Sequence, residues 1–304
     1  MAYKVLFFGE ILWDVIGEKE YIGGAPFNAA AHLAQLNCDS FLVSAVGKDE
    51  RGYKALKEAG ATGVLTDFIQ QQGDYPTGWV DVSILNEEHP VYNIHENVAF
   101  DFIEYNNNIK ELLANNYFDF FYFGTLAQRN KVSRKTLFKI IKQINARRVF
   151  MDVNLRQSFY DKEILQASLS KTDILKLNEE EILSLSEIFL GKKQAESMVV
   201  DYLFNEFSAE VICLTRGARG CTVYYNLAEK LFPAPKVETV DSVGAGDAFS
   251  AGFIYYYLKT DDFSKAAQFG NYLGGFTAST RSAVPVYNGE KIVKQFSRGE
   301  DLSL

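Results

Sequence analysis

A glycine-rich turn with an acid directly behind it stands late in the chain, in Asp241-Ser-Val-Gly-Ala-Gly-Asp-Ala-Phe-Ser-Ala-Gly252. Asp247 follows Gly244, Ala245 and Gly246, and small residues with helical spacing come next. Because the first amides of a helix have no acceptor within the helix, such a helix end binds anions. An acid here would repel a bound anion, but it suits removal of a proton from a hydroxyl while the amides hold the developing charge. The pattern therefore predicts phosphoryl transfer to an alcohol, with Asp247 as the base.

Two polar segments near the N-terminus each have a structural and a functional interpretation. Gly23-Gly24-Ala-Pro-Phe-Asn28 precedes a helical segment. The simpler interpretation is a tight turn followed by a helix cap. The functional interpretation is that the two glycines let a polar substrate come close to the backbone, where Asn28 binds it by hydrogen bonds. Asp14 stands in an apolar run. Its carboxylate is either solvated on a strand or accepts hydrogen bonds from the paired hydroxyls of a sugar.

Polar groups also follow two later apolar runs. Asp152-Val-Asn-Leu-Arg156 puts Asp152, Asn154 and Arg156 on one side of a strand end. This favours a site in which Arg156 binds phosphate or substrate oxygens, and a surface ion pair is the alternative. Asn178-Glu-Glu-Glu181 opens a helix. It predicts a helix cap, and the same two end residues can act through water on Mg²⁺ and phosphate.

A last polar segment, Thr215-Arg-Gly-Ala-Arg-Gly220, links one predicted strand to the next. Its glycines suit a hairpin. The functional alternative is that Thr215 and the backbone of Gly217 hold nucleotide phosphates.

Composition excludes several classes of protein. The chain has 304 residues, 47% of them hydrophobic, and a net charge of −8, which argues against nucleic acid or an anionic membrane as partner. The first apolar run, Val5–Phe8, is too short for a signal peptide or a membrane span. Three cysteines without CxxC spacing indicate a reduced, cytoplasmic protein, although Cys213 and Cys221 could meet across a hairpin.

Missing motifs narrow the choice further. The three histidines, His32, His89 and His95, form no HExxH motif, so we expect structural or surface roles for them and no zinc enzyme. The sequence also lacks a P-loop, a GxGxxG after the first strand, a GxSxG, and the HRD and DFG motifs of protein kinases.

Alternating apolar runs and helical patterns predict the elements that position these groups. Strands are expected at Val5–Gly9, Phe41–Val46, Phe118–Phe123, Arg148–Asp152, Ile174–Leu177 and Val211–Thr215. Helices are expected at Asn28–Leu36, Tyr53–Ala59, Lys131–Ile144, Ile164–Leu169 and Glu179–Phe189. This order predicts an α/β fold with a mostly parallel sheet covered on both faces. Leu12–Ile22 and Thr77–Ile94 alternate like half-exposed antiparallel strands, and we expect them to pair into a small lid over the carboxyl edge of the sheet.

Taken together, these motifs resemble the PfkB (ribokinase-like) family of carbohydrate kinases over essentially the whole chain. The segment ending at Asn28 is similar to the family's N-terminal signature, and Asp241–Gly252 is similar to its long C-terminal signature. Gly9–Asp14, Glu96–Asp101 and Gly124–Arg129 look most like bacterial fructokinases. The resemblance implies one domain, 1–304, with a ribokinase-like three-layer α/β/α fold, a lid from insertions near 12–22 and 77–100, use of ATP and Mg²⁺, and a homodimer.

The resemblance also implies a role for each motif residue. Asp247 is the base, and Gly244, Ala245 and Gly246 form the anion hole. The residues expected to contact the sugar are Asp14, Gly23, Gly24, Asn28, Phe100, Asn154 and Arg156. The residues expected to contact the nucleotide are Asn178, Glu181, Thr215, Gly217, Gly220 and Asn271. Of these, Glu181 is expected to reach Mg²⁺ through water. Asp241 and Val243 mark a site for a monovalent cation such as K⁺. The chain departs from the family at Ser282-Ala283, near that cation loop, where relatives often carry Gly-Ala.

The expected reaction is ATP + D-fructose → ADP + fructose 6-phosphate. Alternative acceptors are ribose, 2-keto-3-deoxygluconate and a nucleoside. A sugar-binding regulator that has kept the fold and lost catalysis is a further alternative. The acid at Asp247 argues against it, because a pure binder gains nothing from an acid facing phosphate.

Overall fold

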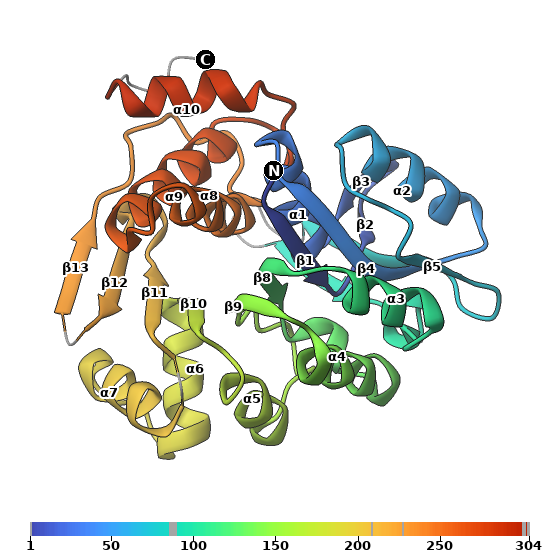
Figure 1. Cartoon of the computed structure of the whole chain (residues 1–304), viewed down its shortest axis with the longest axis horizontal. Helices are drawn as coiled ribbons and strands as arrows, with labels where there is room; N and C mark the ends of the chain where they lie inside the picture. Colours follow the sequence, from blue (N-terminus) through green and yellow to red (C-terminus); the bar gives the residue numbers. More distant parts are fainter. Residues whose placement is uncertain (1, 85–89, 208, 227, 300–301, 303–304) are drawn as a thin grey trace.

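The computed structural model describes residues 2–84, 90–207, 209–226, 228–299 and 302. Within these residues, nine strands form one central sheet (Figure 1). In spatial order they are β13 (Ala228–Phe232), β12 (Cys221–Tyr225), β11 (Val211–Thr215), β10 (Ile174–Asn178), β9 (Ala146–Asp152), β8 (Phe118–Phe123), β1 (Lys4–Phe8), β4 (Asp39–Gly47) and β5 (Ile69–Gln72). The strands from β11 to β5 are parallel, and β12 and β13 extend the sheet antiparallel. The predicted α/β architecture is confirmed.

Helices cover both faces of this sheet. One face carries α1 (Ala25–Gln35), α2 (Glu50–Ala61), α8 (Ala245–Thr260), α9 (Phe263–Ala278) and α10 (Gly289–Ser297). The other carries α3 (Asn107–Asn115), α4 (Lys131–Gln143), α5 (Lys162–Leu169), α6 (Glu179–Leu190) and α7 (Glu196–Glu206). Phe7 belongs to the first core and Phe8 to the second, because successive side chains of a strand point to opposite faces.

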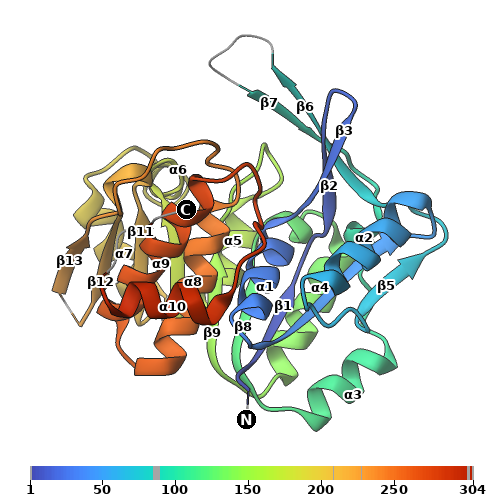
Figure 2. The same ribbon diagram turned by 90° about the horizontal axis from the view of Figure 1, so that it is seen from above.

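A second, four-stranded sheet projects from the edge of the main body, as Figure 2 shows. Its strands, in spatial order, are β3 (Lys19–Gly23), β2 (Leu12–Ile16), β6 (Gly78–Ile84) and β7 (Pro90–Ile94). β2 and β3 are antiparallel, as are β6 and β7, while the two hairpins join through a parallel pairing of β2 with β6. The predicted lid strands are therefore present, although the sequence did not indicate the parallel join. Residues 85–89, which include His89, lie outside the described residues.

The predicted elements agree with the structure to within three residues at their ends. The hairpin expected at Thr215–Gly220 is also present, since Thr215 pairs with Cys221. All three cysteines are free and buried. Among the described residues, no helix combines the length and the apolar character that crossing a membrane requires.

Candidate active site

The glycine-rich turn lies at the N-terminus of α8. Gly244 is the N-cap residue, with a φ of 77° in the left-handed region that favours glycine. A Cβ on Gly244 would lie 2.6 Å from the Cα of Ala283, so a larger residue would also displace that neighbouring segment. No side chain caps this helix end. The Ala245 amide donates to the Ser242 carbonyl over 3.2 Å. The amides that follow it at the start of α8 have no side-chain cap and stay available to an anion.

Asp247, in the first turn of α8, is half-buried. Burial, together with the nearby charge of Asp152, raises its pKa to about 6, against the opposing effects of Asn28, Lys176 and Arg156. Asp247 is thus mostly ionised at neutral pH, yet close enough to neutrality to accept a proton readily. This is the protonation behaviour expected of a general base.

Asn28 joins the N-terminal part of the chain to this acid. Its Nδ2 donates to Asp247 Oδ2 over 2.8 Å. Asn28 is 5% exposed, and its Oδ1 is buried without a partner among the described residues. A buried acceptor without a donor costs free energy, so a ligand hydroxyl that donated to it would be bound favourably.

Two further carboxyl groups approach from β1 and the lid. Glu10 follows β1 and is 2% exposed, and burial with the neighbouring Asp247 raises its pKa to about 7, while Arg156 lowers it. Burial likewise raises the pKa of Asp14, on β2, to about 6, against the effect of Arg156. Gly23 faces Asp14, since a Cβ there would lie 2.6 Å from Asp14 Oδ2. Glu10 thus lies near Asp247, and Asp14 lies beside the turn that precedes α1.

Glycine is required beside Glu10. Gly24 has a φ of 109°, and a Cβ on it would lie 2.5 Å from the Glu10 carbonyl oxygen. The turn before α1 therefore depends on glycine for close packing, which is the structural interpretation of this motif.

Arg156 lies in the loop after β9 and is exposed. Its charge acts on Glu10, Asp14 and Asp247. Within the described part of the chain it takes part in no ion pair, so the surface ion pair considered above is not observed there. Asn154, two residues earlier, is buried with a φ of 43°, a conformation that is strained for a residue other than glycine.

Asp152, at the end of β9, accepts hydrogen bonds from three side chains beneath the turn. Lys176 Nζ lies 2.9 and 3.0 Å from its two carboxylate oxygens. The hydroxyls of Tyr122 and Ser250 each lie 3.1 Å from Oδ2. Asp152 is thereby held in the interior and does not line the surface of the site.

The nucleotide-side candidates begin at the junction of β10 and α6. Asn178 Oδ1 accepts from the amides of Glu180 and Glu181, and Glu181 Oε2 accepts from the amide of Asn178, so the predicted capping arrangement is present. Glu181 Oε1 accepts from the amide of Leu155 over 3.0 Å. Both oxygens of this buried carboxylate accept backbone hydrogen bonds, which fixes Glu181 at the start of α6.

Other candidates lie around the β11–β12 hairpin and α9. Thr215 pairs with Asn178 at the end of β11, and Gly217 opens a short 3₁₀ helix, η3 (Gly217–Arg219). Gly220, with a φ of 95°, has no room for a Cβ because the Phe232 carbonyl lies against it. Asn271 Nδ2 donates to that same carbonyl over 2.8 Å. Gly220 and Asn271 therefore shape the segment that follows β13.

Three candidates stand apart from these groups. Phe100, in the 3₁₀ helix η1 (Ala99–Phe102), is fully buried at the base of the lid against Gly78. Asp241 and Val243 are exposed before α8, where Asp241 Oδ1 accepts from the Val243 amide over 3.0 Å. The described residues contain no cluster of three or more acidic, histidine or cysteine side chains able to hold a metal.

His32 has the structural role expected of it, although the sequence did not indicate its partners. It is fully buried on α1, and burial lowers its pKa to about 4, so the ring is neutral. Its Nε2 lies 3.0 Å from the Ala283 carbonyl, which can only accept, so Nε2 carries the hydrogen. Nδ1 then accepts from the Tyr287 hydroxyl over 3.0 Å. His32 thereby ties α1 to the segment that packs against Gly244, at the Ser282-Ala283 departure.

Glu10 and Lys176 were also missed. Each is a single charged residue next to or within a buried apolar strand, and this contrast in polarity was the available signal.

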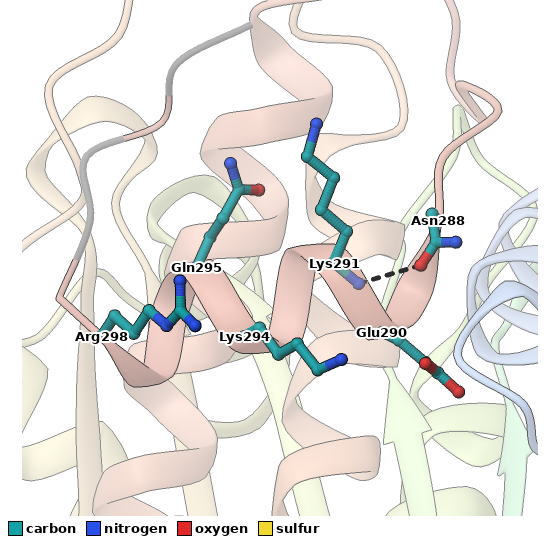
Figure 3. A pocket seen from close by; sticks show the side chains of 6 residues that line it. All are labelled: Asn288, Glu290, Lys291, Lys294, Gln295 and Arg298. Atoms are coloured by element: carbon teal, nitrogen blue, oxygen red, sulfur yellow. Dashed lines mark hydrogen bonds between the residues drawn. The ribbon is translucent and has the colours of Figure 1, made fainter.

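A surface pocket of about 380 Å³ lies elsewhere, along α10, and contains none of the candidate residues (Figure 3). It is lined by Asn288, Glu290, Lys291, Lys294, Gln295 and Arg298.

Comparisons with known proteins agree with this fold. The sequence matches the family model "pfkB family carbohydrate kinase" over residues 2–287. A protein of Pyrococcus horikoshii named as a sugar kinase is 28% identical over 94% of this chain and 93% of its own length. The ATP-dependent 6-phosphofructokinase of Thermoanaerobacterium thermosaccharolyticum is 27% identical over 88% of this chain and 85% of its own length.

Among solved structures, the fructokinase of Xylella fastidiosa with bound ATP has a TM-score of 0.84 at 20% identity. The match covers 96% of this chain and 98% of that one. The family match over residues 2–287 defines a sugar kinase that uses ATP. The chain belongs to the pfkB family of carbohydrate kinases.

Proposed function

We propose that this kinase transfers the terminal phosphoryl group of ATP to the primary hydroxyl of a ketose, D-fructose, and so forms fructose 6-phosphate. The observation that carries the proposal is the pairing of Asn28 with Asp247 beside an uncapped helix end. In this proposal an ionised acid, a buried acceptor and the backbone amides at the start of α8 meet where an alcohol and a phosphate must come together.

Each group has a distinct task in this reaction. Asp247 takes the proton of the attacking hydroxyl, and Asn28 holds the carboxylate in place through Nδ2. The amides at Gly244–Gly246 stabilise the charge that develops on the transferred group. A single positioned base contributes about 10²–10⁴-fold, so most of the acceleration comes from alignment and charge stabilisation.

The charges around the acceptor space favour a neutral sugar. In this proposal the acceptor lies among Glu10, Asp14 and Asp247, and among the described residues Arg156 is the exposed cation that acts on all three. A phosphorylated acceptor needs cations to hold its phosphate. A sugar offers pairs of hydroxyls instead, and these suit Asp14 and the unpartnered Oδ1 of Asn28. The choice of fructose among neutral acceptors rests on the fructokinase-like segments of the sequence.

ATP binds on the other side of the turn in this proposal, near Asn178, Thr215 and Gly217. Mg²⁺ accompanies the nucleotide, neutralises phosphate charge and is reached by Glu181 through water. We further propose stimulation by K⁺ bound near Asp241 and Val243, and a homodimer.

A coupled ADP-release assay across a panel of acceptors tests the proposal. The panel contains fructose, ribose, 2-keto-3-deoxygluconate, a nucleoside and fructose 6-phosphate, with a reaction that lacks any acceptor as the blank. We expect turnover with fructose well above the others. Preference for another acceptor would reject the fructose assignment, and sugar binding without turnover would favour a regulator.

A further inference from the structure

Lys176 carries a charge in the interior of the main sheet. It is the central residue of β10, is 7% exposed, and lies between Leu175 and Leu177, which are fully buried. Lysine is almost never buried unless it is paired. Here the two short contacts of its Nζ with Asp152, at 2.9 and 3.0 Å, provide the pair.

The ammonium lies directly against the glycine-rich turn. A Cβ on Gly246 would be 3.1 Å from Lys176 Nζ, so the absence of a side chain at Gly246 lets the charge approach the backbone. Ser250 adds a second link, because its hydroxyl lies 3.1 Å from both Asp152 Oδ2 and the Gly246 carbonyl. The Lys176–Asp152 ion pair is therefore linked to the start of α8 by the Ser250 hydrogen bonds and by the contact of Lys176 with Gly246.

The surroundings keep Lys176 charged. Burial lowers its pKa, but the charges of Asp152, Glu181 and Asp247 raise it by more, so the net direction is upward. A lysine that served the packing alone would gain nothing from three converging acids. A fixed positive charge close to a phosphate site, in a region of low dielectric, has a strong electrostatic effect.

We propose that Lys176 is a positioning residue for phosphoryl transfer: held by Asp152, its ammonium fixes a positive charge beneath Gly246, beside the amides that receive the transferred group. The inference rests on the proposed function. Lys176 does not touch the sugar in this account. It acts through the turn and through Asp247.

The proposal makes opposite predictions for the two members of the pair. Several titratable or charged groups interact electrostatically with Asp247 or with Lys176. They are Glu10, Tyr122, Asp152, Arg156, Lys176 itself and Glu181. Of the pair, Lys176 lowers the pKa of Asp247 and Asp152 raises it. Lys176→Met should therefore move the acid limb of the kcat/KM profile to higher pH, and Asp152→Asn should move it to lower pH.

The test compares these two variants with the double variant Lys176→Met/Asp152→Asn, with Lys171→Met on the exposed approach to β10 as control. We expect Lys176→Met to lose roughly 10²-fold in kcat, comparable to loss of one preorganised donor. The KM values for ATP and sugar should change far less. The double variant removes the pair with residues of similar size, which proteins commonly tolerate, and should stay as slow as Lys176→Met.

A purely structural pair gives the other results. Recovery of wild-type kcat in the double variant would overturn the inference, because removing both charges would then have cured the defect. Acid limbs that move in the same direction, or a normal kcat in Lys176→Met, would overturn it too. If Lys176→Met does not fold, the double variant and Asp152→Asn decide. A wild-type protein that turns over no sugar would instead reject the proposed function, and this inference with it.

Discussion

The side-chain amide of Asn28 donates to the Asp247 carboxylate over 2.8 Å, although 219 positions separate the two residues in the chain. The contact joins the first turn of α1 to the first turn of α8. Both turns begin at a glycine with positive φ, Gly24 and Gly244. The site is thus built from two helix starts whose backbones come close only because glycine permits it.

Loss of this contact should weaken sugar binding and shift the proton equilibrium of the base. The Asn28 hydrogen bond lowers the pKa of Asp247, so Asn28→Ala should move the acid limb of the kcat/KM profile to higher pH. The sugar KM should rise as well, because the Oδ1 acceptor is gone. Steady-state kinetics across pH measure both effects. An unchanged acid limb and sugar KM would show that the contact is only structural.

Asp14 should affect the sugar and not the nucleotide. It lies on the lid strand β2 beside Gly23, with its carboxylate under the influence of Arg156. Removing a hydrogen-bonding partner of a ligand hydroxyl costs on the order of 1–3 kcal/mol. Asp14→Ala should therefore raise the sugar KM by about 5- to 150-fold and leave the ATP KM nearly unchanged. Glu18→Ala, an exposed change in the same hairpin, is the matched control. Equal effects of Asp14→Ala on both KM values would refute a sugar-side role.

Glu10 should make stability depend on pH. Burial raises its pKa from 4.5 to about 7, so over this range the folded state keeps a proton that the unfolded state loses. The free energy of unfolding contributed by Glu10 therefore falls as pH rises from about 4.5 to about 7, by ~3 kcal/mol in total. Glu10→Gln should remove this loss.

Urea denaturation of wild type and Glu10→Gln at pH values below and above this range measures the difference. The exposed Glu111→Gln serves as control. If the gap in stability between wild type and Glu10→Gln does not change with pH, Glu10 ionises as freely in the folded protein as in the unfolded chain.

Features that are local in the sequence were the ones that could be predicted. The turn and acid at Gly244–Asp247 occupy consecutive positions, and the capping pair Asn178 and Glu181 lies within one helical turn. The apolar runs predicted the strands because parallel strands buried on both faces are continuously apolar.

Features that depend on long-range contacts could not be predicted. The parallel join of β2 with β6 is set by tertiary pairing, and no periodicity signals it. His32 meets Ala283 across 251 positions. Lys176 gave one local signal, a single charge in an apolar strand, but its partner Asp152 is visible only once β9 and β10 lie side by side.

The most direct test of the account is turnover by Asp247→Asn in the coupled assay, with ATP and sugar binding measured in parallel by calorimetry. Asparagine keeps the size of the side chain and an oxygen for the Asn28 donor, and it removes the base. The account predicts a loss of about 10²–10⁴-fold in kcat with both ligands still bound. Turnover close to wild type would contradict it.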